Sequence, residues 1–229
     1  MTPQDIPGAL DVALELDPHV LPDDELRALV AGHPWRRVVV MGDSVAEGVR
    51  EPSPGWRDLS WTDRIVAALG AEEVNLGRRN LLAHTIRQEQ LEAALAARPD
   101  LVILSAGAND AMRRRFDPDA VEAELDAMVA PLRAAGADVL LIEFLDMTQA
   151  GLVPAEHVPR FDAGMRALAG LVRSVAARHD TLLVAMRGHP AESDPALYAS
   201  DRIHLTAHGH AIVATETIRV LSRARERRR

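Results

Sequence analysis

Short runs of apolar, mostly β-branched residues alternate with longer segments of helical period through most of this 229-residue chain. Most of the runs are apolar at every position, as strands are when helices cover both faces of a parallel sheet. We predict strands at Arg37–Met41, Glu73–Leu76, Leu101–Ser105, Asp138–Phe144 and Thr181–Ala185, and helices at Leu59–Leu69, Ala83–Ala97, Pro118–Ala135, Val158–His179 and Ala207–Arg225. This order predicts an α/β fold, a doubly wound three-layer α/β/α sandwich with a five-stranded parallel sheet.

The beginning of the chain differs from the remainder. Residues 1–35 are rich in Asp and Pro, and we expect an N-terminal extension with one short helix near Pro22–Ala31. Residues 36–229 are expected to form a single domain. The extension carries acidic residues where a signal peptide carries positive charge, and no segment reaches the roughly eighteen apolar residues of a membrane-spanning helix. The sequence therefore predicts a cytoplasmic protein without a membrane partner.

The composition excludes several kinds of chemistry. The chain has no Cys, which removes thiolate nucleophiles, zinc ribbons and iron–sulfur clusters. All 26 basic residues are Arg, so Schiff-base chemistry and a P-loop lysine are excluded as well. A formal net charge of −8 disfavours a nucleic-acid partner.

Ligands of such folds bind outside the carboxyl ends of the strands, so the residues that follow each strand are the first candidates for chemistry. Gly42, Asp43 and Ser44 follow the first predicted strand. Small and turn-forming residues there let the chain reverse into a helix and present the Ser44 hydroxyl as a nucleophile. The alternative is that Asp43 and Ser44 only cap that helix.

Two further positions carry side chains that suit acyl transfer. Asn109 comes shortly after the third predicted strand, and its amide is a neutral donor for a developing oxyanion. Asp201 and His204 precede the last predicted helix, and their i, i+3 spacing lets the carboxylate reach the imidazole. A carboxylate in that position fixes the tautomer of the imidazole and stabilises the imidazolium that forms when Ser44 gives up its proton.

With these blocks the chain resembles the SGNH, or GDSL-type, hydrolase family over about residues 36–222. The matching blocks are Gly42-Asp43-Ser44, Gly107-Ala108-Asn109-Asp110 and Asp201-Arg202-Ile203-His204. The resemblance implies a flavodoxin-like sandwich that hydrolyses esters or related acyl bonds through an acyl-serine. It implies that Ser44 is the nucleophile, His204 the general base and then acid, and Asp201 the orienting carboxylate. The Asn109 amide and the Ser44 N–H are implied oxyanion donors.

The second block of the family is where this sequence departs from the pattern. The family places a glycine about five residues after an Asn that ends the second strand, and the glycine N–H completes the oxyanion hole. Here the Asn is Asn75, the fifth residue onward is Asn80, and Gly77 lies three positions earlier. The segment 81–90 resembles actinobacterial-type members, which favours Asn80 as the donor and leaves Gly77 as the second choice. Asn tolerates positive φ better than most residues that have a Cβ.

Three histidines near the end of the chain have the spacing of metal ligands. His204, His208 and His210 form an H-x3-H-x-H pattern. No Cys or second carboxylate cluster accompanies them, so we predict that His208 and His210 line a pocket or a helix surface, and we expect neither a metal nor another cofactor.

The candidate substrate contacts are Asp43, Trp56 and Arg113. Trp56 and Trp61 follow the serine in a loop that contains Pro and Gly, where they form either a pocket wall or an anchor for the loop. Arg113 suits an acidic acyl group, with a solvated charge run as the alternative.

The sequence therefore predicts a serine esterase that acts on a small-molecule ester or acyl substrate. One alternative is an acyltransferase with the same triad, in which a bound hydroxyl or amine acceptor replaces water. Another is a non-catalytic binding module that retains the fold. The acyl group, the alcohol and the oligomeric state do not follow from the sequence.

Overall fold

The central sheet has five parallel strands, as the sequence predicts. The computed structural model describes residues 14–227. The strands are β1 (Arg37–Gly42), β3 (Glu72–Asn75), β4 (Leu101–Ser105), β5 (Asp138–Glu143) and β6 (Leu182–Ala185). Their order across the sheet is β3-β1-β4-β5-β6, which is the 2-1-3-4-5 order of flavodoxin-like folds. The predicted fold class is thus confirmed.

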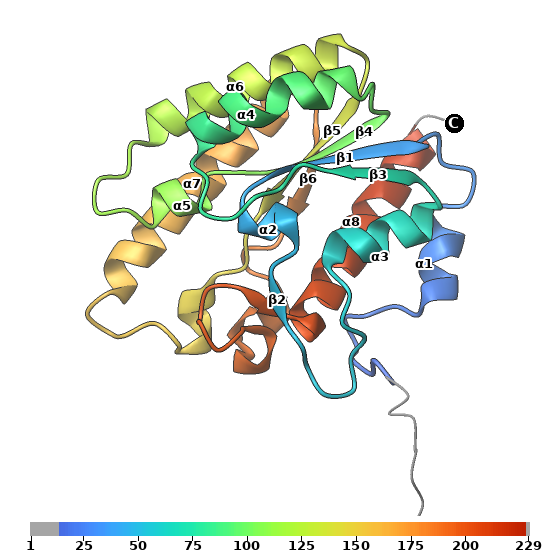
Figure 1. Ribbon diagram of the computed structural model, residues 1–229. Coiled ribbons are helices and arrows are strands. Elements are labelled where there is room, and N and C mark those ends of the chain that lie inside the picture. The colour runs from blue at the N-terminus through green and yellow to red at the C-terminus, as the bar shows by residue number, and fades with distance from the viewer. Residues whose placement is uncertain (1–13, 228–229) are drawn as a thin grey trace, which may run out of the picture.

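Helices cover both faces of this sheet (Figure 1). The covering helices are α1 (Asp23–Leu29), α3 (Trp61–Leu69), α4 (Ala83–Ala96), α6 (Pro118–Ala134), α7 (Val158–His179) and α8 (Ala207–Arg227). Alternate residues of β1 belong to different cores: Val38 and Val40 pack with α1, α3 and α8, whereas Val39 and Met41 pack with α4, α6 and α7. The period of two along each strand therefore divides the apolar residues between two layers.

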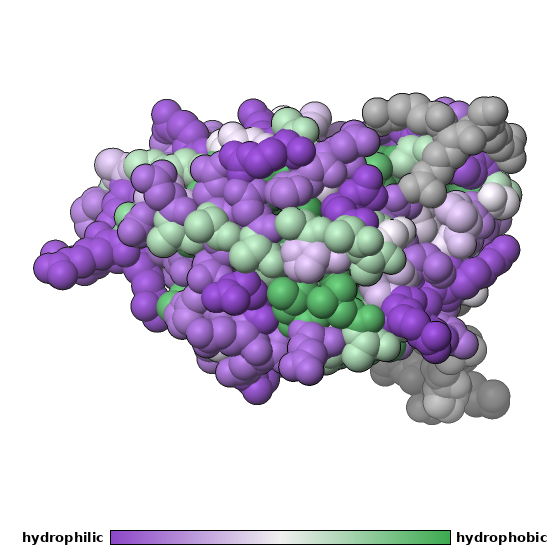
Figure 2. Space-filling model, turned by 90° about the horizontal axis from the view of Figure 1, so that it is seen from above, coloured by the Kyte–Doolittle hydropathy of each residue, from purple (hydrophilic) through white to green (hydrophobic). Residues whose placement is uncertain are grey.

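Seen from above, the molecule presents mainly hydrophilic residues, with the hydrophobic ones gathered in a small central patch and a narrow band (Figure 2). None of the helices in the described part of the chain is long and apolar enough to cross a membrane.

Several short elements lie near the carboxyl ends of the strands, and of these the sequence predicted only the helix that begins at Ser44. They are α2 (Ser44–Glu47), α5 (Ala108–Ala111), the 3-10 helices at Met147–Ala150, Pro190–Ser193 and Pro195–Leu197, and the strands β2 (Arg50–Glu51) and β7 (Leu205–Thr206). β2 and β7 pair in parallel as a separate small sheet. This pairing places the segment after Ser44 beside the segment after His204.

The described part of the N-terminal extension packs onto the rest of the chain. Leu26 of α1 is buried in the core that α3 and α8 share, together with Val30 and Trp35. The Trp35 Nε1–H donates to the Asp138 carboxylate at 2.6 Å. The predicted short helix near Pro22–Ala31 is α1. It has seven residues, beginning after Pro22 and ending at Leu29.

Candidate active site

Ser44 is the first residue of α2, directly after β1 and the turn at Gly42 and Asp43. Gly42 has φ of +145°, and a Cβ there would lie 2.0 Å from the backbone oxygen of Ser105, so no other residue fits this turn. Both backbone polar groups of Gly42 are bound by the side-chain amide of Gln90, at 2.8 and 2.9 Å. A buried glutamine of α4 thus holds the turn that presents Ser44.

His204 and Asp201 reach Ser44 from the loop before β7. The Ser44 Oγ lies 2.8 Å from His204 Nε2, and His204 Nδ1 lies 2.6 Å from an Asp201 carboxylate oxygen. The other Asp201 oxygen accepts the backbone N–H groups of Ile203 and His204 at 2.9 and 3.0 Å. Desolvation by burial acts to raise the pKa of Asp201, but these hydrogen bonds outweigh it and lower the pKa. The carboxylate is therefore charged and faces the imidazole.

Asn109 lies in α5, after β4, with its side chain directed toward the Ser44 turn. Its amide Nδ2 donates to the Leu81 backbone oxygen at 2.9 Å and to Asp43 Oδ2 at 3.3 Å. The other Asp43 oxygen accepts the Val45 N–H at 3.0 Å, so Asp43 caps α2 and also lines the pocket beside Ser44. Burial raises the pKa of Asp43 to about 6.

Asp110 connects α5 with the beginning of α4. Its carboxylate accepts the N–H of Ala83 at 3.0 Å, at the start of α4, which precedes Asp110 in the sequence. The strand order places the beginning of α4 beside α5, so this carboxylate caps a helix distant from it in the chain.

The second block packs closely onto α2. The Asn75 side chain donates to the Ala46 oxygen and accepts the Gly77 N–H, both at 2.9 Å. A Cβ on Gly77 would lie 2.3 Å from the backbone nitrogen of Glu47, so this glycine serves close packing. Asn80 has φ of +67°, the left-handed conformation that the family pattern assigns to glycine. Its N–H donates to no backbone or side-chain acceptor in residues 14–227.

A narrow apolar pocket opens beside the triad. Trp61 lines it, together with Val45, Met112, Phe144 and Ile203 among others. Trp56 is absent from its walls and instead stacks on His208, with ring centroids 4.0 Å apart. Arg113 lies in a different hollow, beside Asp110. Of the three residues chosen as substrate contacts, the structure thus places only Asp43 against this pocket.

The three clustered histidines go to different partners. His204 contacts Ser44, His208 contacts the Asp17 carboxylate at 2.9 Å, and His210 accepts the Trp61 N–H at 2.9 Å. Burial lowers the pKa of His210 to about 4, so it is neutral. Within residues 14–227 no group of three or more His, Cys, Asp or Glu side chains has the arrangement of a metal site.

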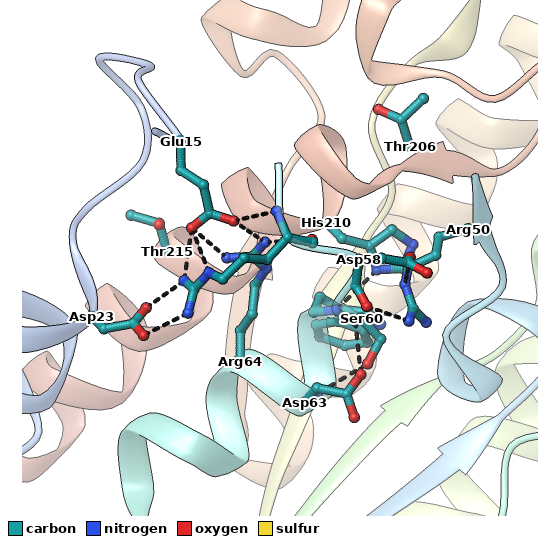
Figure 3. A network of polar contacts seen from close by, with 12 residues as sticks. Glu15, Asp23, Arg50, Asp58, Ser60, Asp63, Arg64, Thr206, His210 and Thr215 are labelled. Carbon is teal, nitrogen blue, oxygen red and sulfur yellow. Dashed lines mark hydrogen bonds and ion pairs between the residues drawn. The ribbon is translucent and has the colours of Figure 1, made fainter. Parts of the chain in front are cut away.

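A network of ion pairs behind the site was missed by sequence reasoning. The Glu15 carboxylate accepts hydrogen bonds from Arg57 and from the buried Arg64, and Asp23 binds Arg57 from the other side (Figure 3). Desolvation by burial opposes ionisation of Glu15, but the two guanidinium groups outweigh it and lower its pKa to about 2. These partners lie 34 to 49 residues apart in the chain, so no local pattern indicates the network.

A flavodoxin-like sheet whose strand ends bring together a serine, a histidine and an aspartate defines an esterase of the SGNH class. The model of the GDSL-like lipase/acylhydrolase family matches residues 40–212. The chain belongs to this family, and it is an SGNH-type esterase.

Solved structures share the fold at low sequence identity. One is LAE5, an α/β hydrolase enzyme from the metagenome of Lake Arreo in Spain, with 23% identity and a TM-score of 0.66. Another is Axe2, an acetylxylan esterase from Geobacillus stearothermophilus, with 21% identity and a TM-score of 0.64. Each comparison covers 81% of this chain and 94% of the other. The search of curated protein sequences gives no match.

Proposed function

We propose that this esterase cleaves a carboxylic ester through an acyl-serine intermediate on Ser44. The observation that carries the proposal is a chain of two hydrogen bonds. The first joins Ser44 Oγ and His204 Nε2 at 2.8 Å, and the second joins His204 Nδ1 and the Asp201 carboxylate at 2.6 Å. These distances suit a nucleophile, its general base and the carboxylate that orients the base.

In the proposed reaction, the Ser44 Oγ attacks the carbonyl carbon while His204 takes its proton. The C–O bond to the alcohol then breaks, and His204 gives the proton to the leaving alcohol. In the second step His204 takes a proton from water, and the resulting hydroxide attacks the acyl carbon. The bond to Ser44 Oγ then breaks, and His204 returns its proton to Ser44 as the acid is released. Asp201 stays ionised throughout and stabilises the imidazolium.

The developing oxyanion is assigned to three donors: the backbone N–H groups of Ser44 and Asn80 and the side-chain amide of Asn109. Asn80 is favoured over Gly77 because the Gly77 N–H is already bound by Asn75, whereas the Asn80 N–H is unengaged within the described chain. The Asn109 proton that faces Asp43 at 3.3 Å forms the weaker of its two bonds and is the one to turn toward the oxyanion.

Catalytic mutants of Axe2 support the assignment of the triad. They alter a serine, an aspartate and a histidine of that enzyme, and the last two lie three positions apart. Asp201 and His204 have the same spacing here. The resemblance of segment 81–90 to actinobacterial-type members stays a prediction.

Replacement of Ser44 by Ala tests the proposal. Turnover of a short-chain p-nitrophenyl ester should fall to background, because no other side chain takes the role of the nucleophile. Ser174→Ala, on the exposed face of α7, is the matched control and should keep full activity. Undiminished activity of the Ser44 variant would contradict the proposal.

Two experiments address the alternatives. A fluorophosphonate probe should label the unaltered protein at Ser44 and leave the Ser44→Ala variant unlabelled, whereas a binding module needs no activated serine. If the enzyme is an acyltransferase, an added alcohol acceptor will yield a new ester in place of the free acid.

A further inference from the structure

The pocket beside Ser44 continues into the core of the α3 and α8 layer. It has a volume of about 80 Å³. Its deeper walls come from separate parts of the chain: the end of β5 with the segment after it, α7, the segment after β6, the segment before β7, and α8. The side chains there include Ile142, Leu145, Met165, Met186, Tyr198 and Val213, all of which are buried.

The polar side chains in the deeper walls are all bound to other parts of the protein. Trp61 donates its Nε1–H to the Val45 oxygen at 2.8 Å, and Tyr198 donates its hydroxyl to the Glu192 backbone oxygen at 2.9 Å. Among these residues of the described chain, none offers a free hydrogen-bonding group to a ligand.

Glu143 and His210, which line the same walls, are engaged in the same way. The Glu143 carboxylate forms a bidentate pair with Arg173, and neutral His210 contacts the Trp61 N–H and the Val49 oxygen. A polar group on a bound acyl chain would lose its water without gaining a partner, which disfavours its entry.

We propose that this cavity binds the acyl part of the substrate and selects an unbranched aliphatic chain of about four to eight carbons. A cavity needs roughly 10–15 Å³ to hold one water-sized group, so this one holds about six such groups. The inference rests on the proposed function, because the acyl carbon attached to Ser44 fixes where the chain enters. It departs from the acetyl group that the name of Axe2 specifies for that enzyme.

Methionine supplies much of the wall. Met112, Met147, Met165 and Met186 all line the cavity, from four separate stretches of the chain. Methionine is unbranched and flexible and fills irregular apolar space, so these walls adjust to chains of neighbouring length better than to a branched or aromatic acyl group.

A series of p-nitrophenyl esters from acetate to dodecanoate tests the inference on the unaltered enzyme. The value of kcat/KM should rise by about fourfold for each added methylene. The rise should end at an acyl chain of about six carbons and reverse beyond eight. An ester with an ether oxygen in place of one buried methylene should lose about tenfold relative to its hydrocarbon counterpart. A preference for acetate, or equal rates for ether and hydrocarbon chains, would overturn the inference.

A pair of variants tests whether the preference for a given acyl chain length arises in the cavity. Met165→Phe narrows the cavity and should move the optimum to a chain at least two carbons shorter. Met128→Phe makes the same change in the buried core between α6 and the sheet, outside the cavity, and should leave the optimum where it is. Equal profiles for both variants would contradict the assignment, and the ester series decides the matter if either variant fails to fold.

Failure of the inference differs from failure of the proposed function. If a fluorophosphonate labels Ser44 but the chain-length profile favours acetate, the esterase assignment stands and the aliphatic pocket does not. If Ser44 reacts with no probe of any chain length, both are wrong.

Discussion

Two segments bring the remaining proposed catalytic groups to Ser44, and they are held in different ways. Segment 75–80, which contains the proposed oxyanion donor, runs along β1 through the backbone bonds of Leu76 to Val40 and of Arg78 to Gly42. Its contacts with α2 are made by side chains: Asn75 donates to the Ala46 oxygen, and Glu47 accepts from both the N–H and the guanidinium of Arg79. Segment 199–206, which contains His204, is held through backbone pairing of β7 with β2.

The second segment also has a side-chain contact with β2. The Glu51 carboxylate accepts the N–H and the hydroxyl of Ser200 at 2.9 and 2.6 Å, directly before Asp201. The residue next to the proposed oxyanion donor is thus tied to α2 by partly exposed charges, whereas the proposed base lies beside a strand pair. Exposed ion pairs contribute little and weaken in salt, so we expect the two segments to respond differently to the same kind of change.

The largest expected effect follows from Asp201→Asn. The substitution keeps the size of the side chain but removes its negative charge. The amide oxygen keeps the backbone N–H groups of Ile203 and His204, so an NH2 group faces His204 Nδ1 and kcat should fall by about 10⁴-fold. Steady-state kinetics on a p-nitrophenyl ester measures this. Asp180→Asn, at the left-handed end of α7, is the control and should retain activity. A loss of kcat of less than tenfold would show that segment 199–206 orients His204 without the Asp201 carboxylate.

An intermediate effect, on stability, is expected from Glu15→Gln, because Glu15 fastens Arg57 and Arg64 behind β2. Loss of the carboxylate leaves the buried Arg64 without its ion pair and should lower the free energy of unfolding by about 2 kcal/mol at pH 7. The pKa of Glu15 is lowered from 4.5 to about 2, so its stabilisation is complete above pH 4.5 and is lost as the pH falls toward 2.

Urea denaturation between pH 7 and pH 3 measures this difference, and the gap between Glu15→Gln and the unaltered protein should narrow as the pH falls. Glu25→Gln, on the exposed face of α1, is the control and should leave the unfolding free energy nearly unchanged throughout. A gap that does not vary with pH would mean that the charge of Glu15 is not what stabilises this region.

The smallest effect is expected from Glu47→Ala, which releases Arg79 next to Asn80. The two side chains are 32% and 59% exposed, so kcat should fall by up to about fivefold with KM nearly unchanged. Glu47→Gln should restore part of the activity because its amide oxygen still accepts the Arg79 N–H. High salt should reduce the difference between the Glu and Gln forms.

Glu72→Ala breaks a similarly exposed pair with Arg37, at the far end of the sheet, and is the control for this variant. If it lowers kcat as much as Glu47→Ala does, the charge pair on α2 has no special role in positioning the oxyanion donor.

Much of the fold was predictable, because each layer leaves a local signal. Apolar runs such as Val38–Met41 fill both faces of a buried strand, and α4, α6 and α7 show the helical spacing that covers them. The positions of Ser44, Asn109 and His204 near strand ends were readable for the same reason, since a parallel sheet brings its carboxyl ends to one edge.

The walls of the pocket were not predictable in this way. Trp56 lies in the loop before α3 and Trp61 is the first residue of α3. Only the packing of α3 against α8 decides that Trp61 lines the cavity while Trp56 stacks on His208. The strands β2 and β7 are two residues long, too short for any periodicity to reveal.

By itself the sequence determined the α/β/α class and the serine, histidine and aspartate that meet at one edge. The period of each strand and the alternation of strands with helices along the chain are encoded locally. The tertiary structure alone decided which segments fasten those residues and how the cavity beneath Ser44 is shaped. Partners such as Glu15 and Arg64, or Glu51 and Ser200, are 49 and 149 residues apart. Contacts over such separations depend on the packing of the whole chain, and no short stretch of sequence specifies them.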